Sequence, residues 1–82
     1  MNPIEQRIMS VQWDIEFNQS QMKELKEKME HTVATCDRAI VDFMAGYVRQ
    51  FNECYEKIRM LDMELEALNR IKEFTESSNF KA

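Results

Sequence analysis

The stretch Ile58–Leu68 reads IRMLDMELEAL, and the spacing of its apolar residues decides the fold class. Ile58, Leu61, Leu65 and Leu68 are three or four positions apart, which places them on one face of an α-helix. The same spacing runs back almost to the start of the chain, and Asn18 is its only polar member. The full apolar stripe consists of Ile4, Ile8, Val11, Ile15, Met22, Leu25, Met29, Val33, Cys36, Ile40, Phe43, Tyr47, Phe51, Cys54, Ile58, Leu61, Leu65 and Leu68. Because an apolar face of this length must be covered by another helix, the sequence predicts an all-α coiled-coil protein that packs in a multi-helix bundle.

The composition supports one helical unit over residues 1–82. The chain has a single Gly, at position 46, and a single Pro, at position 3, and is rich in Glu, Lys, Leu, Met and Gln. Asn2 is a good N-cap ahead of Pro3, which suits the first helical position. The poor helix formers after Glu76 predict a frayed tail over residues 77–82.

Two places weaken an otherwise continuous helical pattern. His31–Thr35 contains three β-branched residues, and Gly46 costs about 1 kcal/mol in a helix relative to Ala. The favoured architecture is one long amphipathic helix over residues 3–76. The alternative is an antiparallel helical hairpin with its turn near Ala45–Gly46, and a third possibility is a break at Thr32–Thr35.

Two groups of residues predict contact with other helices. The aromatic side chains in the middle of the stripe fit a two-stranded coil poorly and favour a bundle of more than two helices. Near the N-terminus, Trp13 and Phe17 lie off the main stripe, which indicates either burial in a bundle or a separate anchoring contact. The predicted protein-interface residues are Trp13, Phe17, Ile40, Phe43, Tyr47, Phe51, Ile58, Leu61, Leu65 and Leu68.

The sequence offers little to support catalysis or cofactor binding. His31 is the only histidine, and Cys36 and Cys54 are too far apart in sequence for the usual zinc-ligand spacing. Glycine-rich phosphate loops and nucleophile motifs are absent. We therefore expect a non-enzymatic protein without a metal or another cofactor, and with its two cysteines as buried, reduced thiols.

Charge and hydropathy narrow the range of partners. The net charge is -4, and the basic residues do not gather into a patch, so nucleic acid is not an expected partner. No apolar run has the length of a membrane span, and the N-terminus lacks the features of a signal peptide. A cytoplasmic protein is therefore expected.

Part of the sequence resembles a known family. From Cys54 the pattern Cys-x3-Ile-x2-Leu-x3-Leu-x-Ala-Leu-x-Arg is similar to the coiled-coil part of the smallest subunits of actin-regulating WAVE complexes. Asp42-Phe43-x3-Tyr47 and Gln6-Arg7 ahead of Trp13 also resemble that family, although the spacing between these segments differs. The resemblance implies a helical strand within a larger assembly.

These patterns together predict a class of function. We expect a structural or interaction protein, namely a small coiled-coil subunit or assembly factor of a heteromeric helical complex. Its partners are expected to be proteins bound by helix packing, with a hetero-oligomer favoured over a homo-oligomer. The alternatives are a small helical chaperone that masks an apolar helix of a client protein and a self-associating homo-oligomeric coiled coil.

Overall fold

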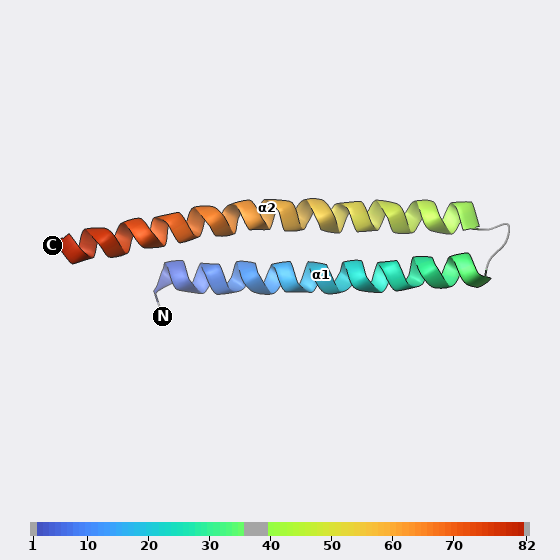
Figure 1. The fold of residues 1–82 in the computed structure, drawn as a ribbon, viewed down its shortest axis with the longest axis horizontal. Helices are drawn as coiled ribbons and strands as arrows, with labels where there is room; N and C mark the ends of the chain where they lie inside the picture. The colour runs from blue at the N-terminus through green and yellow to red at the C-terminus, as the bar shows by residue number, and fades with distance from the viewer. Residues whose placement is uncertain (1, 36–39, 82) are drawn as a thin grey trace.

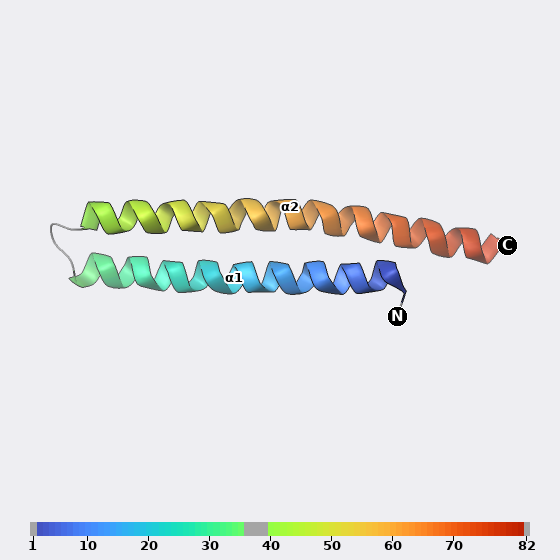
Figure 2. The same cartoon turned by 180° about the vertical axis from the view of Figure 1, so that it is seen from behind.

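The chain forms two long helices that lie side by side. The computed structural model describes residues 2–35 and 40–81, in which α1 spans Pro3–Thr35 and α2 spans Ile40–Lys81. The helices are antiparallel, as the two opposite views show (Figures 1 and 2), and the described residues contain no strand. The molecule measures 68 × 17 × 14 Å, so it is a rod two helices thick.

The predicted all-α class is confirmed, whereas the favoured arrangement as one helix over residues 3–76 is wrong. The chain reverses between Thr35 and Ile40, so the alternative of an antiparallel hairpin describes the structure. The reversal does not lie at Ala45–Gly46, which are both inside α2. It follows directly after the weak segment His31–Thr35. Ending α1 there lets the chain's own C-terminal half cover the apolar stripe of its N-terminal half.

Helix α1 begins with the predicted cap. The backbone N–H of Glu5 donates to Oδ1 of Asn2 over 2.8 Å, and the N–H of Gln6 donates to the carbonyl oxygen of Asn2 over 3.0 Å. The first N–H groups of a helix have no partner within the helix, and the Asn2 side chain satisfies one of them. Pro3, at the first helical position, has no N–H to satisfy.

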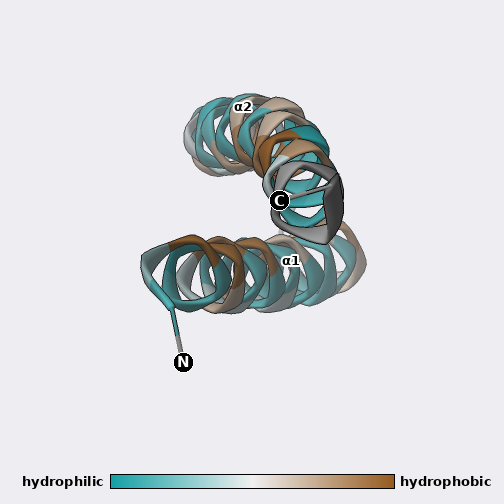
Figure 3. Ribbon diagram, turned by 90° about the vertical axis from the view of Figure 1, so that its left-hand side faces the viewer, coloured by the Kyte–Doolittle hydropathy of each residue, from teal (hydrophilic) through white to brown (hydrophobic). Residues whose placement is uncertain are grey.

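The core is a narrow band along α1. Val11, Ile15 and Leu25 are the buried apolar residues among those described, and Val11 has no exposed surface. All three belong to the predicted stripe, and the end view shows hydrophobic residues recurring on the side of α1 that faces α2 (Figure 3). Two polar residues, Asn18 and Thr32, are buried in the same band. The Asn18 amide donates to the carbonyl oxygen of Asp14 over 2.8 Å, so it does not remain unpaired in the core.

An ion pair between described residues of the two helices shows how they are aligned. Nη2 of Arg7 lies 2.6 Å from Oε1 of Glu64, and Nε of Arg7 also donates to that oxygen over 2.7 Å. The two residues are far apart in sequence, so this pair places the start of α1 beside the C-terminal half of α2. Both side chains are partly exposed, and such a pair contributes little stability but reports the register.

Gly46 occupies an ordinary position inside α2. Its backbone does not have positive φ, and a Cβ built there would meet nothing within 4 Å. The left-handed conformation that glycine adopts after a helix is therefore absent at this residue. Glycine is tolerated here because packing along a long helix outweighs a local cost of about 1 kcal/mol.

Helix α2 is longer than α1 and extends past it. Its C-terminal end projects beyond the N-terminus of α1 in Figure 1, so part of α2 has no neighbouring helix. The helix runs to Lys81, beyond the predicted end at Glu76. The fraying expected for residues 77–82 stays a prediction. Cys36 and the side chain of Ile40 lie outside the described residues.

Candidate protein-interaction surfaces

The residues predicted to form a bundle interface fall on two differently exposed parts of α2. Tyr47, Phe51, Ile58, Leu61, Leu65 and Leu68 are all half-buried. Leu61 lines a groove together with Asp14 and Phe17 of α1, and Tyr47 lines another with Thr32. This inner seam of α2 therefore packs on α1, and the hairpin itself supplies one of the helices that the sequence pattern requires.

A second part of α2 stays largely uncovered. Phe43, Val48 and Tyr55 are 52%, 44% and 56% exposed, although all three are large apolar or aromatic residues. We call Met44, Val48 and Tyr55 the turn-proximal face, because they occupy the half of α2 next to the chain reversal. Met44, Val48 and Tyr55 are spaced by four and seven residues, so they share one side of the helix. The α1 helix does not cover this side.

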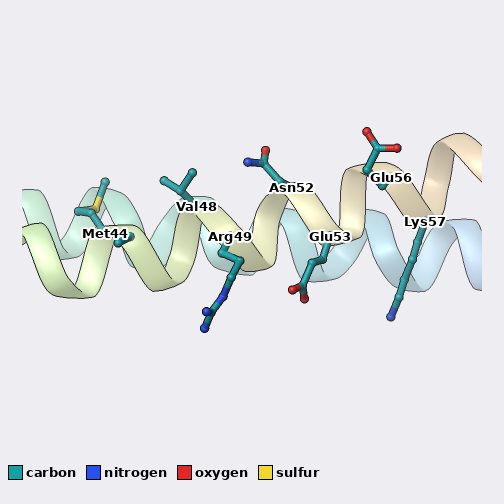
Figure 4. Close-up of a pocket in the computed structure, with 8 residues that line it drawn as sticks. Met44, Val48, Arg49, Asn52, Glu53, Glu56 and Lys57 are labelled. Carbon is teal, nitrogen blue, oxygen red and sulfur yellow. The ribbon is translucent and has the colours of Figure 1, made fainter.

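The surface next to this face has the shape of a helix-packing site. Two rows of side chains border a shallow groove along α2, one formed by Met44, Val48, Asn52 and Glu56 and the other by Ala45, Arg49, Glu53 and Lys57. Figure 4 shows Val48 and Asn52 directed to one side and the charged side chains of the second row directed to the other. Members of each row are four residues apart, and such rows are the ridges between which another helix packs its own side chains. All eight residues belong to α2, so the groove is open to solvent.

The predicted N-terminal anchor is also exposed. Trp13 and Phe17 are 65% and 63% exposed, and Met9, one turn earlier, is 37% exposed. Phe17 borders a second groove, between the helices, which is lined by Asp14, Phe17, Asn18, Glu56, Lys57, Met60 and Leu61. The hairpin thus leaves Trp13 and Phe17 free to contact another molecule, and the anchoring role stays a prediction.

Reactive or metal-binding clusters are lacking in the part of the chain that the structure describes. No group of three or more His, Cys, Asp or Glu residues in 2–35 and 40–81 is placed to hold a metal ion. Cys54 is a free, half-buried thiol. His31 is exposed and lines a shallow groove with Glu24, Glu27, Lys28, Thr32 and Tyr47. Neither α1 nor α2, over its described residues, is long and apolar enough to cross a bilayer.

The apolar spacing identifies the residues of the seam but not the polar contact that joins the two helices. The Arg7–Glu64 ion pair joins residues whose proximity depends on where the chain reverses, so local spacing carries no signal for it. Thr32 belongs to the segment that weakens the helical pattern, yet it is buried in the core. By contrast, the Glu66–Arg70 pair has the favourable i, i+4 order and is present, with Oε1 and Nη2 2.6 Å apart.

Comparison with known proteins gave no relative for this hairpin. No family model, no curated protein and no solved structure matches the chain. The resemblance to WAVE-complex subunits is therefore not supported by a match, and the proposals below depend on the residues themselves.

Proposed function

We propose that this chain is a non-enzymatic helical-hairpin subunit or assembly factor that packs against a helix of another protein in a heteromeric cytoplasmic complex. The observation that carries the proposal is the exposed turn-proximal face. After α1 and α2 have packed together, Phe43, Val48 and Tyr55 still expose about half of their surface. Val48 and Tyr55 lie on one side of α2, where a single added helix would cover both, whereas Phe43 lies about 140° around the helix axis from Val48.

The expected contact is helix packing in the groove beside the turn-proximal face. A partner helix would place a row of its side chains between the two rows that border the groove. Fully burying one large apolar side chain contributes about 1.5–3 kcal/mol, so the uncovered halves of Val48 and Tyr55 together offer about 1.5–3 kcal/mol. Part of this is offset by the entropy lost on association. Charged residues of the second row, such as Arg49 and Glu53, would form the polar rim of the contact.

The exposed N-terminal anchor supports a second contact with the same complex. Aromatic side chains are enriched among the residues that dominate binding energies, and tryptophan most of all. Trp13 and Phe17 lie on α1, and Phe17 borders a groove with Glu56 and Lys57, which also border the groove beside the turn-proximal face. A subunit with exposed apolar residues on both of its helices can contact two neighbouring helices of an assembly. The free thiol of Cys54 is consistent with the reducing conditions of the cytoplasm.

Capture of partners from the native cell tests the proposal when it is paired with a surface variant. The tagged wild-type chain should recover a specific partner that is identified by mass spectrometry. The double variant V48E/Y55E should lose that partner, because two charges would be placed in the contact. The control Q12E/Q50E adds the same charges at exposed glutamines and should keep it. Recovery of the partner by V48E/Y55E at the wild-type level, with helicity unchanged, would contradict the proposal.

A chaperone role is a second candidate, favoured by the groove that Met60 borders near the middle of α2. Met60 and Met63 are 64% and 59% exposed, and Met60 borders the groove that also contains Phe17 and Leu61. Flexible methionine side chains adapt to varied apolar helices. If this role is correct, M60E/M63E should release a captured client and lower the client's solubility, whereas V48E/Y55E should not. The opposite pattern supports the subunit role.

A further inference from the structure

A second apolar stripe runs along the outer side of α2. It consists of Met60, Met63, Ala67, Ile71 and Phe74, and we call it the outer stripe. All five residues are exposed, with Met60 at 64% and Phe74 at 75%. Residues two positions apart lie on nearly opposite sides of a helix, so Ala67 lies away from Leu65 and from the inner seam that packs on α1. Met60 also borders the groove that Phe17 of α1 lines, and all five residues stay exposed in the hairpin.

The outer stripe has the same spacing in both directions. Its steps are three, four, four and three residues, which makes it symmetric about Ala67. Two copies of α2 that pack antiparallel across a two-fold axis at Ala67 would therefore bring apolar residues together at every level. Met60 would meet Phe74 of the second copy, a favourable pairing of thioether and aromatic ring, and Met63 would meet Ile71. The small Ala67 at the axis lets the two helices approach closely.

The charges beside the outer stripe are complementary under the same symmetry. Arg59, Glu66, Arg70 and Glu73 are exposed and follow one another at steps of seven, four and three residues, so they lie along one side of the stripe. The two-fold axis at Ala67 places Arg59 near Glu73 of the second copy and Glu66 near Arg70 of the second copy. Every pair across the axis on this side is of opposite sign. Such an alternation favours one orientation of the two chains over others.

We propose that a second copy of this chain docks antiparallel on the outer stripe and forms a two-fold symmetric dimer of hairpins. The α1 helix packs on the inner seam of α2, and Met60 is the stripe residue that borders the groove shared with α1. The stripe from Met60 to Phe74 is about 21 Å long at the helical rise of 1.5 Å per residue. A contact this short is smaller than a standard interface, so the dimer is reversible and dissociates on dilution. It leaves the turn-proximal face free for the partner proposed above, and it does not depend on that proposal.

Sedimentation velocity of the purified full-length chain tests this dimer. We expect the wild type to pass from monomer to dimer between about 1 and about 500 μM, the range of weak associations. Ala67→Glu places two like charges at the two-fold axis and should weaken dimerisation by about 100-fold or more. Ala34→Glu makes the same change at an exposed alanine of α1, away from the stripe, and should dimerise like the wild type. Circular dichroism checks that all three chains keep the same helicity.

A charge-swap pair keeps the test decisive if Ala67→Glu perturbs folding. The chain R59E/R70E carries only acidic residues at positions 59, 66, 70 and 73, and the chain E66R/E73R carries only basic ones there. Each chain alone should therefore dimerise less than the wild type. Mixing the two should restore a dimer at least as tight as that of the wild type. The proposal is overturned if the wild type stays monomeric over the whole range, if folded Ala67→Glu dimerises normally, or if mixing restores nothing. Because purified chain alone is used, failure here leaves the partner proposal unaffected.

Discussion

Replacing Gly46 with Ala should stabilise the protein. The sign of this effect distinguishes a hairpin with Gly46 inside α2 from one that turns at Gly46. Gly46 lies inside α2, its φ is not positive, and a Cβ at this position would meet no atom within 4 Å. An added methyl group is therefore accommodated without strain. It also reduces the backbone freedom that the unfolded chain loses on folding.

The expected gain in the free energy of unfolding is about 0.8–1 kcal/mol, the difference between Gly and Ala inside a helix. For a domain of this size, that corresponds to a rise in Tm of roughly 4–8 °C. Urea and thermal unfolding followed by circular dichroism at one fixed protein concentration would measure both quantities. The fixed concentration matters because self-association also changes apparent stability.

The neighbouring residue supplies a matched control for this prediction. Ala45 is exposed and helical, so Ala45→Gly should lower the free energy of unfolding by about the same 0.8–1 kcal/mol. If Gly46 instead ended a helix in the left-handed conformation, Gly46→Ala would destabilise the protein. A loss of stability in Gly46→Ala would therefore refute the placement of Gly46 inside α2.

Two further substitutions test the core and the N-terminal cap. Leu25→Ala should cost about 2–3 kcal/mol, since Leu25 is 5% exposed, whereas Val33→Ala should change stability by less than about 0.5 kcal/mol, since Val33 is 57% exposed. Urea unfolding measures both, and equal costs would contradict the assigned core. Asn2→Ala should cost about 1 kcal/mol through loss of its hydrogen bond to the N–H of Glu5, while Asn2→Asp should cost much less. Equal effects of the two Asn2 variants on thermal unfolding would show that the cap contributes nothing.

The apolar spacing predicted most of the packed residues, because a helix repeats its faces at a fixed period, but Val33 and Phe43 of the same stripe are 57% and 52% exposed. Val11, Ile15 and Leu25 are buried as that period requires, and the polar interruption at Asn18 lies in the same band. The N-cap was predicted for a similarly local reason. Its hydrogen bond joins residues three positions apart, so the sequence alone contains all the information needed.

The position of the chain reversal could not be predicted from local patterns. Gly46 is the most permissive residue in the chain, yet it lies inside a helix. The helix breaks after His31–Thr35, where several small local costs coincide. A regular stripe can pair with itself about many points, so the choice depends on the summed packing of two complete helices. For the same reason, sequence spacing could not show that Trp13 and Val48 remain exposed while Leu61 packs on α1.

In the hairpin, α1 and α2 of one chain pack side by side in an antiparallel register. Gln19 and Asn52 are both exposed, and each lies the same number of residues along its helix from the Arg7–Glu64 contact. Spin labels on cysteines at these two positions, in a chain carrying Cys36→Ser and Cys54→Ser, would report the distance between the helices. Dilution with unlabelled chain removes distances between molecules.

Pulsed electron paramagnetic resonance on this doubly labelled chain is the most direct test. Helix axes packed about 8–10 Å apart should bring the two labels within about 25 Å of each other. A single continuous helix would hold them about 50 Å apart, and a turn at Gly46 would offset them by about 30 Å along the axis. A distance distribution centred below about 25 Å is the result predicted here, and one centred near 50 Å would contradict the hairpin.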